Sequence, residues 1–252
     1  PPCLIDVLPE ELPAAASLAR CLKKRTGTAT YANGDDGCGY IKTIVEEPIM
    51  PKLKIAVAGI SARAGWAVNA LKNYEQDVEL VGLCDIAVEK CEWAKQQYDL
   101  SPEIPCFSDV NELLSNVDCD AVMVMTTDAH HAEVAVAALQ AGKLVFCEKP
   151  LETTMEKCRQ TVDADEKAGG NTFVGFNLRY SPVYAKIKEI LESGELGRIL
   201  TVQADEFYGG GRTYFRRWNR WREKGGGLWI TKASHDFDII TWLIGGEQPE
   251  TV

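Results

Sequence analysis

Residues 55–64, with the sequence IAVAGISARA, decide the fold of this chain. Four apolar residues lead into Gly59, and small residues follow where a helix can begin. A strand that passes through a glycine turn into a helix is the first unit of a doubly wound α/β fold. The helix N-terminus offers N–H groups and a positive dipole, so this turn predicts a pyrophosphate site.

The turn departs at one position from the glycine-rich dinucleotide fingerprint G-x-G-x-x-G/A. Gly59 can make the turn and Ala64 is small enough for close helix–strand packing, but Ser61 stands where the second glycine belongs. Its side chain occupies space near the phosphate, although its hydroxyl can donate a hydrogen bond. The candidate cofactor-binding residues of this loop are Gly59, Ser61, Ala62 and Arg63.

Strand and helix patterns alternate along the chain after this turn. Strands are predicted at 55–58, 78–84, 121–125, 144–147 and 172–176, and helices at 66–73, 88–98, 110–115, 132–141 and 155–168. Continuous Val, Ile and Met runs indicate strands buried on both faces. Right-handed crossovers then give an α/β fold with a doubly wound parallel (Rossmann) sheet.

Asp85 ends the second predicted strand, 26 positions after Gly59. A carboxylate there can accept hydrogen bonds from the ribose hydroxyls of NAD, and it disfavours the 2′-phosphate of NADP. The alternative is that Asp85 only caps the next helix. We expect NAD as cofactor, and Arg63 keeps NADP as an alternative because a guanidinium can pair with a phosphate.

Composition excludes several classes of protein. The formal net charge is −10, from 37 acidic and 27 basic residues, which disfavours nucleic acid as a partner. Nine scattered cysteines and three histidines without zinc-site spacing predict reduced thiols and no metal. No apolar run approaches the roughly 20 residues of a membrane span. We therefore expect a cytoplasmic protein with no membrane contact.

Three regions are predicted. Residues 1–50 are an N-terminal extension of unknown role, because Met50 followed by a strand looks like a natural start. Residues 51–178 form the dinucleotide-binding Rossmann domain. Residues 179–252 begin an α+β substrate and oligomerisation domain with a helix at 183–192, a long strand at 199–207 and a helix at 233–244. That domain looks incomplete, so we expect truncation at the C-terminus and a homo-oligomer in the full-length form.

Three longer segments carry a family resemblance. They are DAVMVMTTDAHHAEVAVAALQAGKLVFCEKPL at 120–151, VGFNLRYSPVYAKIKEILESGELGRI at 174–199 and GGGLWITKASHDFDIITWLIGG at 225–246. Over about 200 residues from Lys52 the chain resembles the Gfo/Idh/MocA family, the glucose–fructose oxidoreductase and inositol dehydrogenase relatives. The resemblance implies hydride transfer between a nicotinamide and a hydroxyl-bearing carbon of a sugar, inositol or related polyol.

The resemblance also implies catalytic roles. Lys149, in the Glu148-Lys149-Pro150 motif, would contact the substrate hydroxyl and the nicotinamide ribose. His235 would take the hydroxyl proton, as an imidazole that titrates near neutrality can. The alternatives are a surface ion pair for Glu148–Lys149 and a helix-capping role for His235.

One position departs from the family pattern Asp-x-Gly-x-His. Thr231 stands four residues before His235, where many relatives have the aspartate. We therefore expect either Lys232 to pair with His235 or Asp236 to serve in place of the missing carboxylate.

Further contacts are expected from the loop after the third predicted strand. By resemblance, Thr126, Thr127, Asp128 and His131 would touch the nicotinamide and its ribose, as would Glu148. Packing at the start of a helix is an equal alternative for His131.

The stretch 208–227 interleaves arginines with aromatic residues, which suits either a substrate loop or a subunit interface. Nucleic-acid binding is a third interpretation, because such residues stack on bases, but the net charge of −10 disfavours it. The candidate substrate-contacting residues are Arg179, Tyr208, Trp218, Lys232 and His235.

The leading hypothesis is an NAD(P)-dependent dehydrogenase acting on CH–OH groups. Two alternatives stay open: a glycoside-cleaving enzyme that uses NAD for transient oxidation, and a non-catalytic nucleotide-binding sensor.

Overall fold

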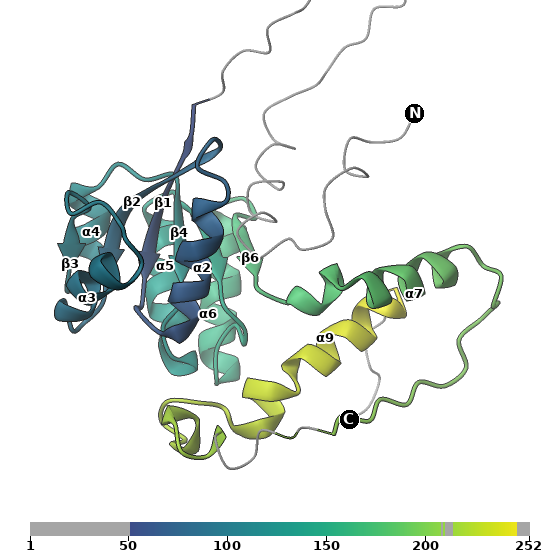
Figure 1. Cartoon of the computed structure of the whole chain (residues 1–252). Coiled ribbons are helices and arrows are strands. Elements are labelled where there is room, and N and C mark those ends of the chain that lie inside the picture. Colours follow the sequence, from purple (N-terminus) through teal and green to yellow (C-terminus); the bar gives the residue numbers. More distant parts are fainter. Residues whose placement is uncertain (1–50, 208, 210–213, 246–252) are drawn as a thin grey trace, which may run out of the picture.

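A parallel sheet lies at the centre of the larger folded part of the molecule (Figure 1). The computed structural model describes residues 51–207, 209 and 214–245; the extension 1–50 and Tyr208 lie outside the described residues. The strands lie in the order β3-β2-β1-β4-β5-β6 and all pair in parallel. Their bounds are β1 Leu53–Ala58, β2 Val78–Cys84, β3 Cys106–Phe107, β4 Ala121–Val124, β5 Leu144–Cys147 and β6 Thr172–Val174.

Helices cover both faces of this sheet, as a doubly wound fold requires. They are α2 Ala62–Lys72, α3 Glu89–Gln97, α4 Val110–Asn116, α5 His131–Gln140 and α6 Met155–Lys167. Successive residues of β1 point to opposite faces: Ile55 and Val57 pack in a core with α2 and α3, whereas Ala56 and Ala58 pack in a core with α4 and α5. The predicted α/β fold is confirmed.

The strand order reverses direction between β1 and β4, because β1 pairs with β2 on one side and with β4 on the other. At such a switch point the loops after the two strands separate, and ligands of open α/β sheets bind in the crevice between them. The turn at Gly59 and the loop after β4 both lie at this edge.

One strand of the sheet, β3, was not predicted from the sequence. β3 has only two residues, Cys106–Phe107, and pairs with the end of β2. A two-residue strand shows no periodicity, so only its partner strand reveals it.

The rest of the chain folds beside the sheet as helices and loops. It contains η3 Asn177–Tyr180, α7 Pro182–Glu192, η4 Trp218–Arg220, η5 Leu228–Lys232 and α9 Ser234–Leu243. Figure 1 shows α7 and α9 side by side, and Lys188 of α7 lies 5.6 Å from the ring of Trp242 in α9.

The strand expected at 199–207 is wrong. The structure shows irregular, exposed chain there, which forms the open connection after α7 (Figure 1). A strand needs a partner for its N–H and C=O groups, and no strand among the described residues pairs with the backbone of this segment. Among the described helices, none is long and apolar enough to cross a membrane.

Candidate functional site

Gly59 makes the turn after β1, and no other residue fits there. Its φ is +94°, and a Cβ at this position would lie 2.5 Å from the backbone nitrogen of Thr126. The turn after β1 therefore lies directly against the loop after β4, at the switch point of the sheet. Close approach of these two backbones is the structural reason for the glycine.

Ser61 is the N-cap of α2. Its hydroxyl oxygen accepts hydrogen bonds from the N–H groups of Arg63 and Ala64, at 3.2 and 3.4 Å, and the hydroxyl donates to the carbonyl of Met125 at 3.0 Å. The hydroxyl proton is thus used within the protein, which corrects the expectation that it would donate to a phosphate. The N–H groups of Ser61 and Ala62 have no acceptor among the described residues and are the donors left for a phosphate.

Both carboxylate oxygens of Asp85 accept hydrogen bonds within the protein. One carboxylate oxygen accepts a 2.8 Å hydrogen bond from the N–H of Ile60, in the turn after β1. The other accepts from the N–H of Ala87 and from the ammonium of Lys90, both at 3.0 Å. Asp85 is 8% exposed. It braces the turn after β1 and the segment before α3, and the ribose contact expected of it stays a prediction.

Arg63 lies at a different part of the site from the one expected. Its Nε is 3.5 Å from a carboxylate oxygen of Glu148, after β5, and its guanidinium lies 5.1 Å from the centre of the Trp66 ring. The expectation that Arg63 would meet the 2′-phosphate of NADP is therefore not supported. The cation next to Asp85 is Lys90.

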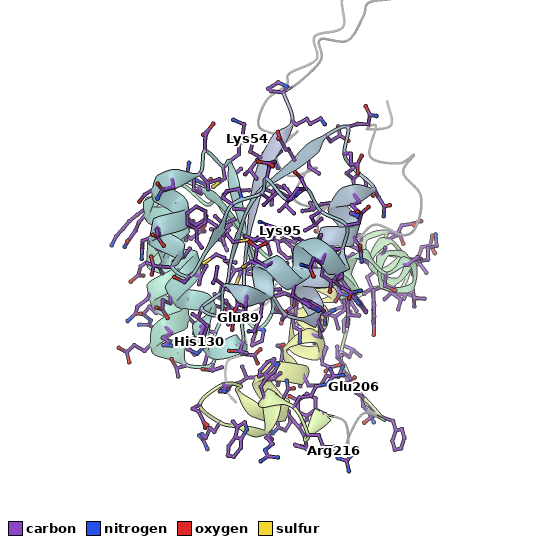
Figure 2. The ribbon with its side chains drawn as sticks, turned by 60° about the vertical axis from the view of Figure 1, so that its left-hand side comes forward. Lys54, Glu89, Lys95, His130, Glu206 and Arg216 are labelled. Carbon is purple, nitrogen blue, oxygen red and sulfur yellow. The ribbon has the colours of Figure 1, made fainter. Side chains whose placement is uncertain are left out.

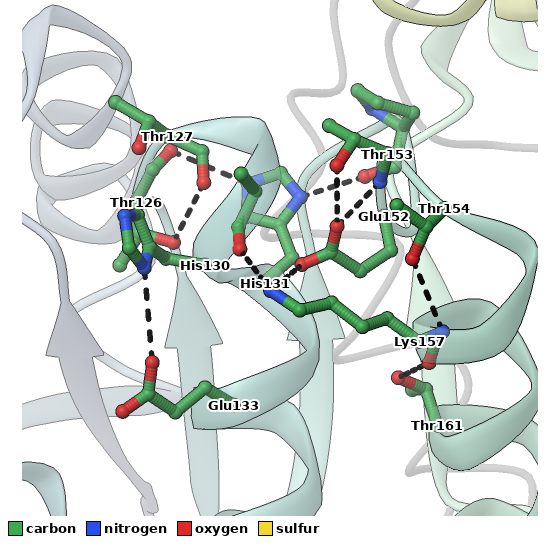
Figure 3. A network of polar contacts seen from close by, with 12 residues as sticks. Thr126, Thr127, His130, His131, Glu133, Glu152, Thr153, Thr154, Lys157 and Thr161 are labelled. Atoms are coloured by element: carbon green, nitrogen blue, oxygen red, sulfur yellow. Dashed lines mark hydrogen bonds and ion pairs between the residues drawn. The ribbon is translucent and has the colours of Figure 1, made fainter. Parts of the chain in front are cut away.

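His131 is a structural residue (Figure 3). Its side chain is 1% exposed, Nδ1–H donates to the carbonyl of Pro150 at 2.6 Å, and Nε2 lies 3.3 Å from the carbonyl of Thr126. Of the two interpretations, the structure favours packing. The imidazole joins the loop after β4 to the loop after β5, where the Lys149–Pro150 peptide is cis.

Buried Glu152 fixes the same corner of the molecule (Figure 3). Its carboxylate accepts from the N–H and hydroxyl of Thr153 and pairs with Lys157 at 3.5 Å. Lys157 also donates to the carbonyl of Ala129 at 2.7 Å. The loop that carries Thr126, Thr127 and Asp128 is thereby held against α6.

Asp128 forms a hydrogen bond with the second half of the chain. It is 4% exposed, and its carboxylate accepts a 2.6 Å hydrogen bond from the hydroxyl of Thr231. The carbonyl of Thr231 accepts a 2.7 Å hydrogen bond from Nζ of Lys149. Thr231, at the position for which the resemblance predicts an aspartate, thus contacts a carboxylate that comes from the loop after β4.

Lys149 and His235 share one electrostatic environment. Burial lowers the pKa of Lys149, and Glu148 and Asp128 partly oppose that change. Burial and the charges of Lys149 and Lys232 lower the pKa of His235 to about 4. The near-neutral pKa expected of His235 is therefore wrong. Its Nδ1 is buried without a hydrogen-bond partner among the described residues, and its ring stands edge-on to Phe176 at 6.1 Å.

Lys232 forms an ion pair that the sequence did not suggest. Its Nζ lies 2.6 Å from a carboxylate oxygen of Glu206, which Figure 2 places beside the C-terminal helical segment. Burial and Glu206 raise the pKa of Asp236. Both residues named as substitutes for the missing aspartate, Lys232 and Asp236, thus lie close to Glu206.

Two residues predicted to contact the substrate make contacts within the protein. The guanidinium of Arg179 makes a bidentate ion pair with Asp238 of α9, at 2.8 and 2.5 Å, so it anchors η3 to α9. The ring of Trp218 packs against the backbone of Gly225, where an added Cβ would lie 3.2 Å from it. Thr231, Glu206 and Asp238 were missed, because their importance comes from partners that are distant in sequence.

The donor set suits a dinucleotide at the switch point. Free N–H groups begin α2, the Asp85 carboxylate ends β2, and Lys149 follows β5. Backbone N–H groups suit a phosphate, a carboxylate suits ribose hydroxyls, and all three groups lie at the carboxyl edge of one sheet.

Two family models match the chain. Residues 53–176 match the oxidoreductase family with an NAD-binding Rossmann fold, and residues 188–252 match the C-terminal alpha/beta domain of the same oxidoreductase family.

Curated relatives and solved structures agree with this result. A putative oxidoreductase, YteT of Bacillus subtilis, is 32% identical over 79% of this chain and 47% of its own length. Inositol 2-dehydrogenase of Salmonella typhimurium is 32% identical over 76% of this chain and 54% of its own length. The WlbA dehydrogenase of Bordetella pertussis, solved with NADH and UDP-GlcNAcA, has a TM-score of 0.70 and 28% identity, over 77% of this chain and 59% of that one. The chain spans about half the length of the curated relatives it matches.

Proposed function

The chain belongs to the Gfo/Idh/MocA oxidoreductase family, and from this we propose that it transfers a hydride between NAD and a hydroxyl-bearing carbon of a sugar, inositol or related polyol. The site residues assigned below are part of the same proposal.

The observation that carries the proposal is the convergence of Lys149 and His235. Lys149 follows β5 at the carboxyl edge of the sheet, and its Nζ is held by the carbonyl of Thr231, four residues before His235. The charge of Lys149 is among the causes that lower the pKa of His235. A hydrogen-bond donor and a neutral imidazole therefore lie together beside the proposed nicotinamide position.

These two residues can carry the proton side of the reaction. An ammonium has three N–H donors, and Thr231 uses one of those of Lys149, so others can polarise the reacting oxygen. His235 is neutral at physiological pH because its pKa is lowered to about 4, so its ring can accept the hydroxyl proton. The nicotinamide of bound NAD accepts or supplies the hydride.

The polar groups around His235 suit a substrate with several hydroxyls. Glu206, Lys232 and Asp236 lie together next to it, and carboxylates and ammonium groups can bind hydroxyls as acceptors and donors. Relatives include an inositol dehydrogenase and a structure that holds UDP-GlcNAcA. Both polyols and charged sugar derivatives therefore belong in a substrate screen. The homo-oligomer expected of the full-length protein stays a prediction.

The test combines NAD binding with turnover. Calorimetric titration with NAD and NADP should show binding with a preference for NAD, and a panel of inositols, sugars and nucleotide sugar acids should yield NADH absorbance with at least one substrate. Lys149→Met should abolish turnover and weaken NAD binding only by the loss of its ribose contact, whereas Lys167→Met, at the exposed end of α6, should change neither.

Other outcomes would favour the alternatives. NAD binding without turnover of any substrate would favour a nucleotide-binding sensor. Glycoside cleavage without accumulation of NADH would favour transient oxidation. Turnover that survives Lys149→Met would overturn the role given to this lysine.

A further inference from the structure

We propose that Asp128 is a positioning residue that holds the ammonium of Lys149 in place through Thr231, so that one buried carboxylate of the Rossmann domain orders the reactive lysine and the segment before His235. This inference rests on the role of Lys149 in the proposed function.

Thr231 connects the two residues through both of its polar groups. Its hydroxyl donates to Asp128 at 2.6 Å and accepts from the N–H of Gly226 at 3.0 Å. Its carbonyl accepts from Nζ of Lys149 at 2.7 Å. Thr231 is 5% exposed, so water does not replace these partners easily. The hydroxyl bonds fix the orientation of the residue, and the carbonyl direction follows from it.

The burial of Asp128 shows that this contact is not incidental. A carboxylate that is 4% exposed loses most of its hydration, and this loss raises its pKa. Thr231, His131 and Lys149 favour the charged form. The same loop is tied to the second half of the chain by the N–H of Ala129, which donates to the carbonyl of Lys224 at 3.2 Å.

The charges around Lys149 divide into two pairs. Glu148 and Asp128 stabilise its ammonium, whereas Arg63 and Lys232 destabilise it. Glu148 is shared with Arg63, at 3.5 Å. Asp128 and Lys149 each favour the charged form of the other. Loss of Asp128 would leave the lysine with weaker compensation for its burial and with a less fixed acceptor.

The test measures the titration of Lys149 directly. Lysine labelled with ¹³C and ¹⁵N is incorporated into the whole chain, the Lys149 signal is assigned from its loss in Lys149→Arg, and its shift is followed against pH without substrate or NAD. We expect Asp128→Asn to lower the pKa of Lys149 by about one unit, the lower end of the effect of a nearby opposite charge. An unchanged pKa in folded Asp128→Asn would overturn the proposal.

Thr231→Val and Thr231→Ser test the connection separately. The valine variant removes the hydroxyl and keeps the volume, whereas the serine variant keeps the hydroxyl. We expect Thr231→Val to lower kcat about tenfold with little change in the KM for NAD, and Thr231→Ser to retain most of kcat. Equal loss in both variants would overturn the proposal. The NMR measurement needs no turnover. If the chain has no dehydrogenase activity, the proposed function fails, and the pKa of Lys149 in Asp128→Asn still decides whether Asp128 acts on the lysine.

Discussion

The N–H of Ile60 donates a 2.8 Å hydrogen bond to the carboxylate of Asp85, and this bond joins the turn after β1 to the end of β2. The turn after β1, proposed to bind the phosphates, and the carboxylate of Asp85, proposed to bind the ribose, are therefore held in one fixed geometry. A change in either residue should alter the geometry of both parts of the cofactor site.

Asp85→Asn should weaken NAD binding about tenfold or more, because a charged acceptor for Ile60 is lost and hydrogen bonds to charged groups contribute roughly 1.5–3 kcal/mol. NADP binding should weaken less, since the negative charge that disfavours its 2′-phosphate disappears as well. Calorimetry with both cofactors measures the ratio. Asp120→Asn is the control, because Asp120 accepts from the N–H of Lys54 at the opposite, amino end of the sheet. Equal weakening by both variants would contradict the assignment.

Gly59→Ala should destabilise the fold by more than about 2 kcal/mol, because left-handed backbone alone costs roughly 1–2 kcal/mol and the new Cβ would overlap Thr126. NAD binding should be lost with it. Gly142→Ala is the matched control: its φ is +72° but nothing lies within 4 Å, so only the backbone cost applies. Chemical denaturation of both variants compares the two free energies of unfolding. Similar values would mean that the backbone approach at Gly59 tolerates a side chain.

Ser61→Gly should tighten NAD binding severalfold. The serine oxygen now accepts from the N–H groups of Arg63 and Ala64, and glycine would release both to a phosphate. Helix stability should change by only a few tenths of a kcal/mol, since glycine is a tolerable N-cap, whereas Ser61→Ala should cost about 1 kcal/mol. Calorimetry and thermal unfolding measure the two effects. Weaker NAD binding in Ser61→Gly would show that the hydroxyl itself contributes to the site.

His235 should make folding less favourable at low pH. Its pKa is about 4 in the folded chain, against an ordinary value of 6.5 for histidine, so between these values the unfolded state binds more protons. The stability from neutral His235 is present above about pH 6.5 and is lost as the pH falls toward 4. Urea unfolding of the wild type and His235→Gln should show a difference that changes through this window. A difference that stays constant with pH would contradict the lowered pKa.

Arg179 and Asp238 should behave as a coupled pair in stability and not in substrate binding. Their bidentate contact joins η3 to α9, and Asp238 is largely buried while Arg179 is partly exposed. A double-mutant cycle with alanine should give a coupling energy of about 1 kcal/mol, reduced from a fully buried pair by solvent screening. A coupling near zero, together with a raised KM in Arg179→Ala, would restore the substrate role expected from the sequence.

The cofactor domain was predictable because its signals are local. The apolar runs of β1, β2, β4 and β5, the glycine turn at Gly59 and the carboxylate at Asp85 are each readable within a few residues. Buried parallel strands need continuous apolar sequence, and a left-handed turn needs glycine. β3 was not predicted, because a strand of two residues is too short to show an alternating or continuous apolar pattern.

The partners of the polar residues were decided only by the tertiary structure. Ser61 was expected to donate to a phosphate, but its hydroxyl donates to the carbonyl of Met125 and accepts from the N–H of Arg63 at the start of α2. Arg179 looked like a substrate ligand, but Asp238 lies within reach in space, 59 residues away in the chain. A strand at 199–207 had suitable residues but no neighbour to pair with among those described.

Sequence by itself therefore determined the α/β class, the order of the longer strands and helices of the Rossmann domain, and most of the residues at its carboxyl edge. The tertiary structure decided which of their polar groups already have hydrogen-bond partners within the protein. A hydrogen bond joins whatever donor and acceptor the fold brings within about 3 Å. Asp128 and Thr231 are 103 residues apart in the chain, and only the packing of the second half against the Rossmann domain makes them partners.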